Sequence, residues 1–185
     1  MLKLFSQIFA PFFSSYIGKI GIPDSILLKT GKLDADEFEI MKTHTTLGRQ
    51  AIEHAEKGID QHIEFLSCAK EIAQSHQEKW DGSGYPQGLA GDAIPISARL
   101  MALADVYDAL ICRRVYKPSF PHTKAVGIIL DGRGSHFDPD VVDAFAAIES
   151  EFRAIAERFI DSDQDILEKQ KQLESAVGAL ERASG

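Results

Sequence analysis

The chain has 185 residues, of which 44% are hydrophobic and 26% are charged, as is ordinary for a soluble globular protein with one domain. Its net charge of −8 and pI of about 5.2 argue against nucleic-acid polymers and anionic membranes as partners, so a phosphate ligand would need a local cluster of cations. The two cysteines, Cys68 and Cys112, form no CxxC pair and predict no disulfide framework, which fits a cytoplasmic setting.

Residues 1–16 form an apolar N-terminal segment that begins MLKLFSQIFAPFF. The stretch is far too short to span a bilayer, contains Gln7 and Pro11, and lacks the small-residue cleavage site of a signal peptide. We therefore expect neither secretion nor a transmembrane helix. The segment is expected to pack on the domain as an apolar cap or to be disordered.

The first predicted helix follows a short turn after Pro23. Asp34 and Glu37 match a capping box, in which each side chain accepts a hydrogen bond from the backbone of the other residue. Apolar residues continue at roughly helical spacing to about Glu56. The pattern predicts one helix from Asp34 to about Glu56.

Later segments are also typical of helices. Apolar residues at intervals of three and four predict helices over residues 61–77 and 96–112. Asp138-Pro139 predicts a further helix start, since proline is favoured at the first helical position. No segment alternates with a period of two, so the sequence predicts an all-α domain.

Residues 149–185 differ in composition from the preceding chain and predict a helical tail. Ile166, Leu173 and Leu180 lie seven residues apart, and Glu and Lys fill many of the intervening positions. Three heptad positions are few for a coiled coil. The tail is therefore either a solvated helix packed on its own domain or a helix that dimerises or relays a signal.

Asp105 lies in the segment RLMALADVYDAL, where apolar residues occupy most of the neighbouring positions. A buried carboxylate is costly unless it is paired or bound to a metal. Asp108 or Arg99 could be that partner in a purely structural role. The alternative is that Asp105 is a metal ligand.

Two histidines have apolar surroundings. His76 closes the apolar stripe of its predicted helix, and His44 ends the stretch IMKTH. Imidazoles together with a carboxylate suit Zn, Mn or Fe, although inward histidines can equally be hydrogen-bonded core residues. His54, His62 and His122 have polar neighbours and are expected at the surface, whereas His136 is expected to shape a loop; these four are not candidate ligands.

Cations occur at two places where a phosphate could bind. Lys19 lies in IGKIGI, where glycines permit close backbone approach and the apolar neighbours favour an anionic partner for the lysine. Arg113, Arg114 and Lys117 follow the helix that contains Asp105. They could bind phosphate or only offset the dipole at the helix C-terminus.

The run HQEKWDGSGYP joins a possible metal ligand, a helix end and a Gly/Pro-rich loop at residues 76–86. Loops on rigid scaffolds often carry function, so this loop is a candidate rim of a binding site. With IGKIGIPD, LLKTGKLDADEFEIMKTH, IPISARLMALADVYDAL and GSHFDPDVV in this order, the sequence resembles the HD-GYP family of bacterial cyclic-di-GMP phosphodiesterases. The resemblance covers residues 17 to about 145 and predicts an HD-GYP-like domain over residues 17–148.

The resemblance implies an all-α, HD-domain-like helical bundle that holds two or three metal ions, usually iron or manganese. The family hydrolyses a phosphodiester of cyclic-di-GMP with a metal-activated water. By position, the metal ligands are His44, His76 and Asp105, and Lys19 matches the catalytic lysine that contacts the substrate phosphate. Ligand-binding residues implied in the same way are Lys19, Tyr85, Arg114 and Lys117.

The chain departs from the family pattern at three points. Ser15-Tyr16 stand where the His-Asp pair is expected, and the second histidine of the family's HHE motif is Gln77. The upstream helices have no recognisable counterpart before residue 15. Because neutral Gln and Ser are poor ligands for these ions, we expect a domain shortened at its N-terminus, with a partial or absent metal site.

Three functional interpretations remain open. The first is an HD-GYP-like signalling domain with impaired phosphodiesterase activity that still binds cyclic-di-GMP or a protein partner. The second is an active metal-dependent phosphodiesterase completed by other ligands or by a partner chain, and the third is a truncated fragment without an independent role. A homodimer could form through the N-terminal segment or the C-terminal helix.

Overall fold

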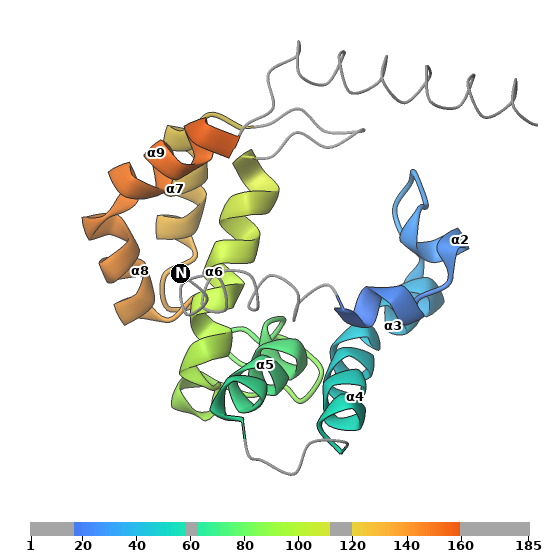
Figure 1. Cartoon of the computed structure of the whole chain (residues 1–185). Helices are drawn as coiled ribbons and strands as arrows, with labels where there is room; N and C mark the ends of the chain where they lie inside the picture. Colours follow the sequence, from blue (N-terminus) through green and yellow to red (C-terminus); the bar gives the residue numbers. More distant parts are fainter. Residues whose placement is uncertain (1–16, 58–62, 112–119, 160–185) are drawn as a thin grey trace, which may run out of the picture. The chain divides into compact units, whose positions relative to one another are not determined.

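Figure 1 shows the computed structural model, which describes residues 17–57, 63–111 and 120–159. The chain divides into two units, residues 1–147 and residues 148–185. Within the described ranges the regular elements are all helices, accompanied by one isolated β-bridge between Arg133 and Phe137. The expected all-α fold is confirmed.

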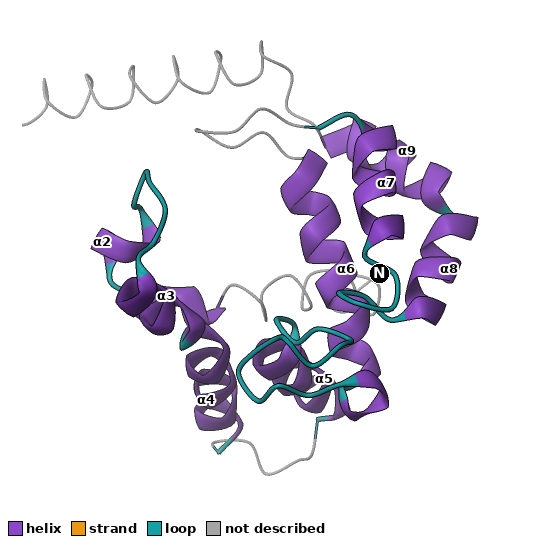
Figure 2. Cartoon of the chain, turned by 180° about the vertical axis from the view of Figure 1, so that it is seen from behind, coloured by secondary structure: helices purple, strands orange, loops and turns teal. Residues whose placement is uncertain are grey.

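The first unit contains seven described α-helices and two short 3-10 helices. In chain order these are η1 (Ile17–Gly21), α2 (Asp24–Leu27), α3 (Ala35–Lys42), α4 (His44–Glu56), α5 (Glu64–Ser75), η2 (Gly91–Ala93), α6 (Ile96–Ile111), α7 (His122–Asp131) and α8 (Pro139–Ala147). Helices α4 and α5 lie side by side, and α6 packs on α5, α7 and α8 (Figures 1 and 2).

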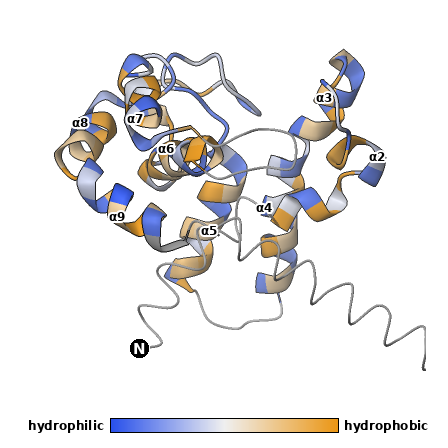
Figure 3. Ribbon diagram, turned by 90° about the horizontal axis from the view of Figure 1, so that it is seen from above, coloured by the Kyte–Doolittle hydropathy of each residue, from blue (hydrophilic) through white to orange (hydrophobic). Residues whose placement is uncertain are grey.

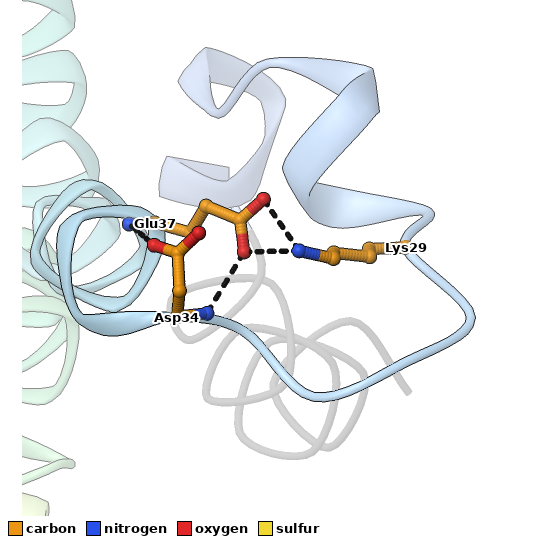
Figure 4. Close-up of polar contacts among 3 residues, drawn as sticks. All are labelled: Lys29, Asp34 and Glu37. Atoms are coloured by element: carbon orange, nitrogen blue, oxygen red, sulfur yellow. Dashed lines mark hydrogen bonds and ion pairs between the residues drawn. The ribbon is translucent and has the colours of Figure 1, made fainter.

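The predicted capping box at the start of α3 is confirmed. The backbone N–H of Glu37 donates to Asp34 Oδ1 and the N–H of Asp34 donates to Glu37 Oε2, each at 2.9 Å. Lys29 Nζ, from the segment after α2, also donates to Glu37 Oε1 at 2.6 Å (Figure 4). These contacts satisfy the first turn of α3 and attach it to the preceding chain.

The predicted single helix from Asp34 to Glu56 is wrong, because the structure divides it at Thr43 into α3 and α4. The Thr43 hydroxyl donates to the carbonyl of Ile40 at 2.6 Å, and the Thr43 N–H donates to the same carbonyl at 3.0 Å. A threonine side chain that competes for a backbone carbonyl disturbs regular helical hydrogen bonding. The break makes His44 the first residue of α4.

The apolar core that supports this region lies between α4 and α5. Ile52 of α4 and Ala69 and Ala73 of α5 are buried, and Ile17 and Leu66 pack against them. The small alanines allow the two helices to approach closely, as at other helix contacts. This packing brings Ile52 together with residues that follow it by 17 and 21 positions in the sequence.

Helix α6 is the central element of the other half of this unit. Its buried residues include Met101, Leu103 and Tyr107, which contribute to the core that it shares with its neighbours. Helix α8 begins at Pro139 as predicted, and Asp138 Oδ1 accepts the N–H of Asp140 at 2.8 Å. Helix α7 was not predicted from the sequence.

The second unit contains α9 (Glu149–Phe159) among its described residues. Figure 3 colours this helix with both hydrophilic and hydrophobic residues. The heptad positions Ile166, Leu173 and Leu180 lie outside the described residues, so the two interpretations of the tail stay predictions. Among the described helices, none combines the length and the apolar character needed to cross a membrane.

Candidate functional site

The site is centred on two buried histidines from neighbouring helices. His44 is the first residue of α4, and His76 follows the last residue of α5. Their Nε2 atoms lie 3.2 Å apart, and the rings meet edge to face with centroids 5.2 Å apart. The structure therefore brings together two of the three predicted metal ligands, which are separated by 32 positions in the sequence.

The outer nitrogens of both rings are held by backbone carbonyls. His44 Nδ1 donates to Met41 O at 2.7 Å, and His76 Nδ1 donates to Ile72 O at 2.9 Å. A carbonyl can only accept, so each Nδ1 carries the proton of the neutral ring. Each Nε2 of the neutral pair then presents a lone pair to the other histidine.

Electrostatics favour the neutral form of both rings. Burial is the main cause that lowers the pKa of His76 to about 4, and the neighbouring His44 and Lys19 contribute to that shift. Burial is also the main cause of the lowered pKa of His44, with a smaller contribution from Lys19. The lone pairs of the two buried Nε2 atoms repel each other unless a cation lies between them or beside them.

The pair fits a metal ion. Two imidazole nitrogens bound at about 2.1 Å to one ion lie about 3.0 Å apart at an octahedral angle and about 3.4 Å apart at a tetrahedral angle. The observed 3.2 Å lies between these values. The backbone hydrogen bonds at Nδ1 are the outer contacts that usually orient metal-bound histidines.

Asp105 lies in the middle of α6 and is half-buried. The described residues contain no group of three or more His, Cys, Asp or Glu side chains that could hold a metal, so Asp105 does not complete such a group with His44 and His76. Its assignment as a ligand stays a prediction. Arg99, which the sequence offered as a partner for Asp105, forms ion pairs with Asp138 at 2.7 Å and with Asp92 at 3.0 Å.

Lys19 reaches the histidine pair because η1 lies directly against α4. A Cβ atom added to Gly18 would come within 1.8 Å of the carbonyl oxygen of His44 and 2.7 Å of the backbone nitrogen of Gly48. Only a glycine permits this approach. Lys19 is half-buried, and its positive charge contributes to the lowered pKa of both histidines.

Glu78 organises the loop between α5 and α6, which is drawn in teal in Figure 2. This carboxylate is 2% exposed and accepts the backbone N–H groups of Gln87 at 2.7 Å and Leu89 at 3.0 Å. In the same loop, the N–H of Tyr85 donates to the carbonyl of Gln77, the residue before Glu78, at 3.1 Å. The Tyr85–Pro86 peptide bond is cis.

Tight backbone packing explains a glycine of the DGSGYP motif. A Cβ atom added to Gly84 would lie 2.3 Å from the backbone nitrogen of Lys79 and 2.5 Å from Glu78 Cα. Backbone hydrogen bonds attach the start of the loop to the segment before α8. Trp80 N–H donates to His136 O at 3.1 Å, and Asp81 N–H donates to Ser135 O at 2.9 Å. The GSHFDP motif thus supports the DGSGYP loop.

Tyr85 forms part of the rim of the histidine pair. Its ring lies edge to face with His44 at a centroid distance of 6.3 Å and with Phe38 of α3 at 6.0 Å. Burial raises the pKa of Tyr85 to about 12, so the phenol is neutral. Lys42 Nζ lies 6.0 Å from the centroid of the same ring.

Of the predicted site residues, the structure gathers Lys19, His44, His76 and Tyr85. Arg114 and Lys117 lie outside the described residues, so their assignments stay predictions, as does the expectation about Ser15-Tyr16. No role in the site was predicted for Glu78, Phe38 and Lys42. The available signals were the position of Glu78 two residues after His76 and the position of Phe38 and Lys42 just before His44.

The other histidines conform in part to expectation. His54 is exposed, and His136 lies in the loop before α8, where its ring stacks on Phe137 with centroids 4.2 Å apart. His122 was expected at the surface, but it is half-buried and its Nδ1 lies 2.9 Å from the Tyr107 hydroxyl. His62 lies outside the described residues.

Comparisons with known proteins agree with the arrangement of motifs. The HD domain family model matches residues 5–141. A probable cyclic di-GMP phosphodiesterase of Vibrio cholerae is 62% identical over 147 residues, covering 80% of this chain and 33% of that protein. A second Vibrio cholerae protein, a cyclic di-GMP phosphodiesterase, is 60% identical over 146 residues, covering 79% of this chain and 30% of that protein.

A cyclic di-GMP phosphodiesterase of Thermotoga maritima is 46% identical over 147 residues, which cover 80% of this chain and 38% of that protein. The chain thus spans about a third of the length of these relatives. The match to the family model includes the helices that position the histidine pair and the loop beside it. The chain therefore belongs to the HD domain family and, within it, to the HD-GYP proteins.

Proposed function

We propose that this chain is a cyclic-di-GMP-binding HD-GYP domain in which phosphodiester hydrolysis is impaired. The observation that carries the proposal is the buried His44–His76 pair, whose unprotonated Nε2 atoms face each other close to the charge of Lys19. The pair attracts a metal cation and Lys19 attracts an anion. Because these relatives are named cyclic di-GMP phosphodiesterases, cyclic-di-GMP is the ligand that we propose for the site.

Each residue of the site has a distinct role in this proposal. His44 and His76 would hold iron or manganese, which supplies a Lewis acid and lowers the pKa of a bound water. Lys19 balances the negative charge of a phosphodiester oxygen. Glu78 holds the loop that carries Tyr85, so that the Tyr85 ring lies against His44 before a ligand arrives.

Two features support impaired hydrolysis. Two imidazoles occupy only part of the coordination sphere of iron or manganese, and the described residues supply no group of three ligands. Gln77 stands at the position of the second histidine of the HHE motif, and its backbone carbonyl is engaged by Tyr85 N–H. Loss of further ligands weakens the activation of water more than it weakens the contacts of the lysine with phosphate.

The test uses the full 185-residue chain. Calorimetric titration with cyclic-di-GMP in the presence of Mn²⁺ measures binding, and chromatography of the same mixture after incubation measures the linear dinucleotide product. We expect saturable binding with little product. Absence of binding would overturn the proposal, whereas many turnovers per chain would replace it with the second candidate, an active phosphodiesterase.

The matched variant for this test is Lys19→Met, which removes the charge but retains most of the apolar stem. We expect it to weaken cyclic-di-GMP binding about tenfold, because a charge-assisted phosphate contact contributes about 1.5–3 kcal/mol. Lys70→Met is the control, since Lys70 forms an ion pair with Glu56 at the far end of α4. That end lies about 18 Å along the helix from His44 at 1.5 Å per residue.

A further inference from the structure

Phe38 and Lys42 lie beside Tyr85, and no role at the histidine pair is assigned to them. They are four residues apart on α3, so their side chains share one face of the helix. Lys42 Nζ lies 5.5 Å from the centroid of the Phe38 ring and 6.0 Å from that of Tyr85. The result is one ammonium group above two aromatic rings.

This cluster is continuous with the candidate metal site. The Tyr85 ring contacts Phe38 on one side and His44 on the other, with centroids 6.0 and 6.3 Å apart. Helix α3 ends at Lys42, only two residues before His44. A ligand anchored at the histidine pair could therefore extend over Tyr85 to Phe38 and Lys42.

The exposure of Phe38 is unexplained by the stability of the fold. The side chain is 45% exposed, although burial of a phenylalanine would contribute about 1.5–3 kcal/mol. An exposed aromatic ring next to a cation is a suitable surface for a nucleobase, because any base can stack its face on the ring. Exposure of this ring makes it available to a ligand.

The present partner of Lys42 is weakly held. Lys42 Nζ forms an ion pair with Glu39 Oε1 at 2.6 Å, where the Lys42 and Glu39 side chains are 26% and 69% exposed. Ion pairs with such solvent-exposed carboxylates contribute little stability. A phosphodiester could thus replace Glu39 as the partner of Lys42, with little loss of stability from the broken ion pair.

The start of α3, which leads directly into Phe38, is held by several hydrogen bonds. The capping box of Asp34 and Glu37, together with the ion pair from Lys29, holds the start of α3 in place (Figure 4). Phe38 follows Glu37 directly, and its ring is braced by Tyr85. A binding surface on an anchored helix loses little freedom when a ligand arrives.

We propose that Phe38 and Lys42 form a second subsite for a purine cyclic dinucleotide, in which Phe38 stacks on one base and Lys42 contacts the phosphodiester that does not lie at the histidine pair. The inference rests on the proposed function, because the first phosphodiester is taken to lie beside Lys19 and the histidines. A cyclic dinucleotide carries two phosphodiesters and two bases on one ring. Two subsites would therefore recognise it better than a nucleotide with a single phosphate.

The experiment measures the affinity of the full chain for cyclic-di-GMP by calorimetry in the presence of Mn²⁺. We expect Lys42→Met and Phe38→Ala each to weaken binding about tenfold, which corresponds to about 1.4 kcal/mol. Lys42→Arg and Phe38→Trp retain the charge and the aromatic face, so they should stay within about threefold of the wild type. Lys70→Met, which removes another ion-paired lysine, on α5, should bind like the wild type.

Glu39→Gln gives a readout that a purely structural role of Lys42 would not produce. This variant removes the carboxylate that competes with the phosphate for Lys42, so affinity should rise about twofold to threefold. Glu64→Gln on α5 is its control, since Glu64 is an exposed carboxylate in the first turn of another helix. Melting curves of all variants should lie within about 2 °C of the wild type, because every altered side chain is at least partly exposed.

The possible results separate this inference from the proposed function. If the wild type binds cyclic-di-GMP and Lys42→Met and Phe38→Ala bind equally well, the second subsite is overturned while the proposed function stands. If the wild type does not bind, both fail. If Phe38→Ala changes only the sedimentation coefficient, the ring is a protein contact and the subsite is again overturned.

Discussion

Replacement of Gly18 by alanine tests whether the contact between η1 and α4 builds the site. The added Cβ atom would lie 1.8 Å from the carbonyl oxygen of His44, whereas ordinary contacts begin near 3.4 Å. The two backbones would have to separate by about 1.6 Å. Neither side can relieve the overlap by a rotamer change, because the atoms on both sides belong to the main chain.

The expected cost follows from the general penalty for overpacking. Such insertions destabilise by about 1–3 kcal/mol, and a clash between two backbones should lie at the upper end, at about 3 kcal/mol. For a chain of this size, each kcal/mol lowers the melting temperature by about 2–4 °C, so Gly18→Ala should melt about 6–12 °C below the wild type. The displacement of Lys19 should also weaken cyclic-di-GMP binding.

The assay is thermal unfolding followed by circular dichroism, with Gly127→Ala as the matched control. Gly127 lies within α7, and a Cβ atom there would meet no atom within 4 Å. Alanine is favoured over glycine in helices by about 0.5–1 kcal/mol, so the control should melt at or above the wild-type temperature. A Gly18→Ala protein that melts within about 2 °C of the wild type would refute the reasoning.

Four further predictions address the Glu78 loop, the metal content, stability in acid and the cations that follow α6 in the sequence. Glu78→Gln should lower the free energy of unfolding by about 2–3 kcal/mol in urea titrations, because its amide cannot accept from both backbone N–H groups; an unchanged midpoint would contradict this role. Elemental analysis of freshly purified protein should find less than one iron or manganese per chain, and still less in His76→Gln; two or more equivalents surviving dialysis would rule out the impaired site. Burial, reinforced by Lys79, lowers the pKa of His136. The stability that its neutral form contributes is therefore present above about pH 6.5 and is lost as the pH falls. Between pH 7 and pH 5 the melting temperature of His136→Gln should fall less than that of the wild type, and equal falls would count against this origin. Arg114→Ala should weaken cyclic-di-GMP binding about tenfold or more, and a lowered melting temperature with unchanged affinity would instead favour a role at the C-terminus of α6.

Several features of the fold were predictable because they depend on residues close together in the chain. The capping box of Asp34 and Glu37 and the start of α8 at Pro139 involve groups within three residues of each other, so local chemistry decides them. The break at Thr43 is also local, but a threonine within a helical pattern does not reveal whether its hydroxyl will compete for a carbonyl. Helix α7 was missed for a related reason, since no capping box marks its start after Pro121.

The sequence by itself determined the all-α class and the family, since these rest on local periodicity and on ordered motifs, and it predicted His44, His76, Lys19 and Tyr85 as site residues. Only the tertiary structure decided that two histidines 32 positions apart present their lone pairs to each other at 3.2 Å. That distance depends on how closely α4 packs on α5, and the tautomers depend on which backbone carbonyl each Nδ1 meets in the folded chain. In the same way, the approach of Lys19 is set by the contact of Gly18 with α4, which no pattern along the chain records.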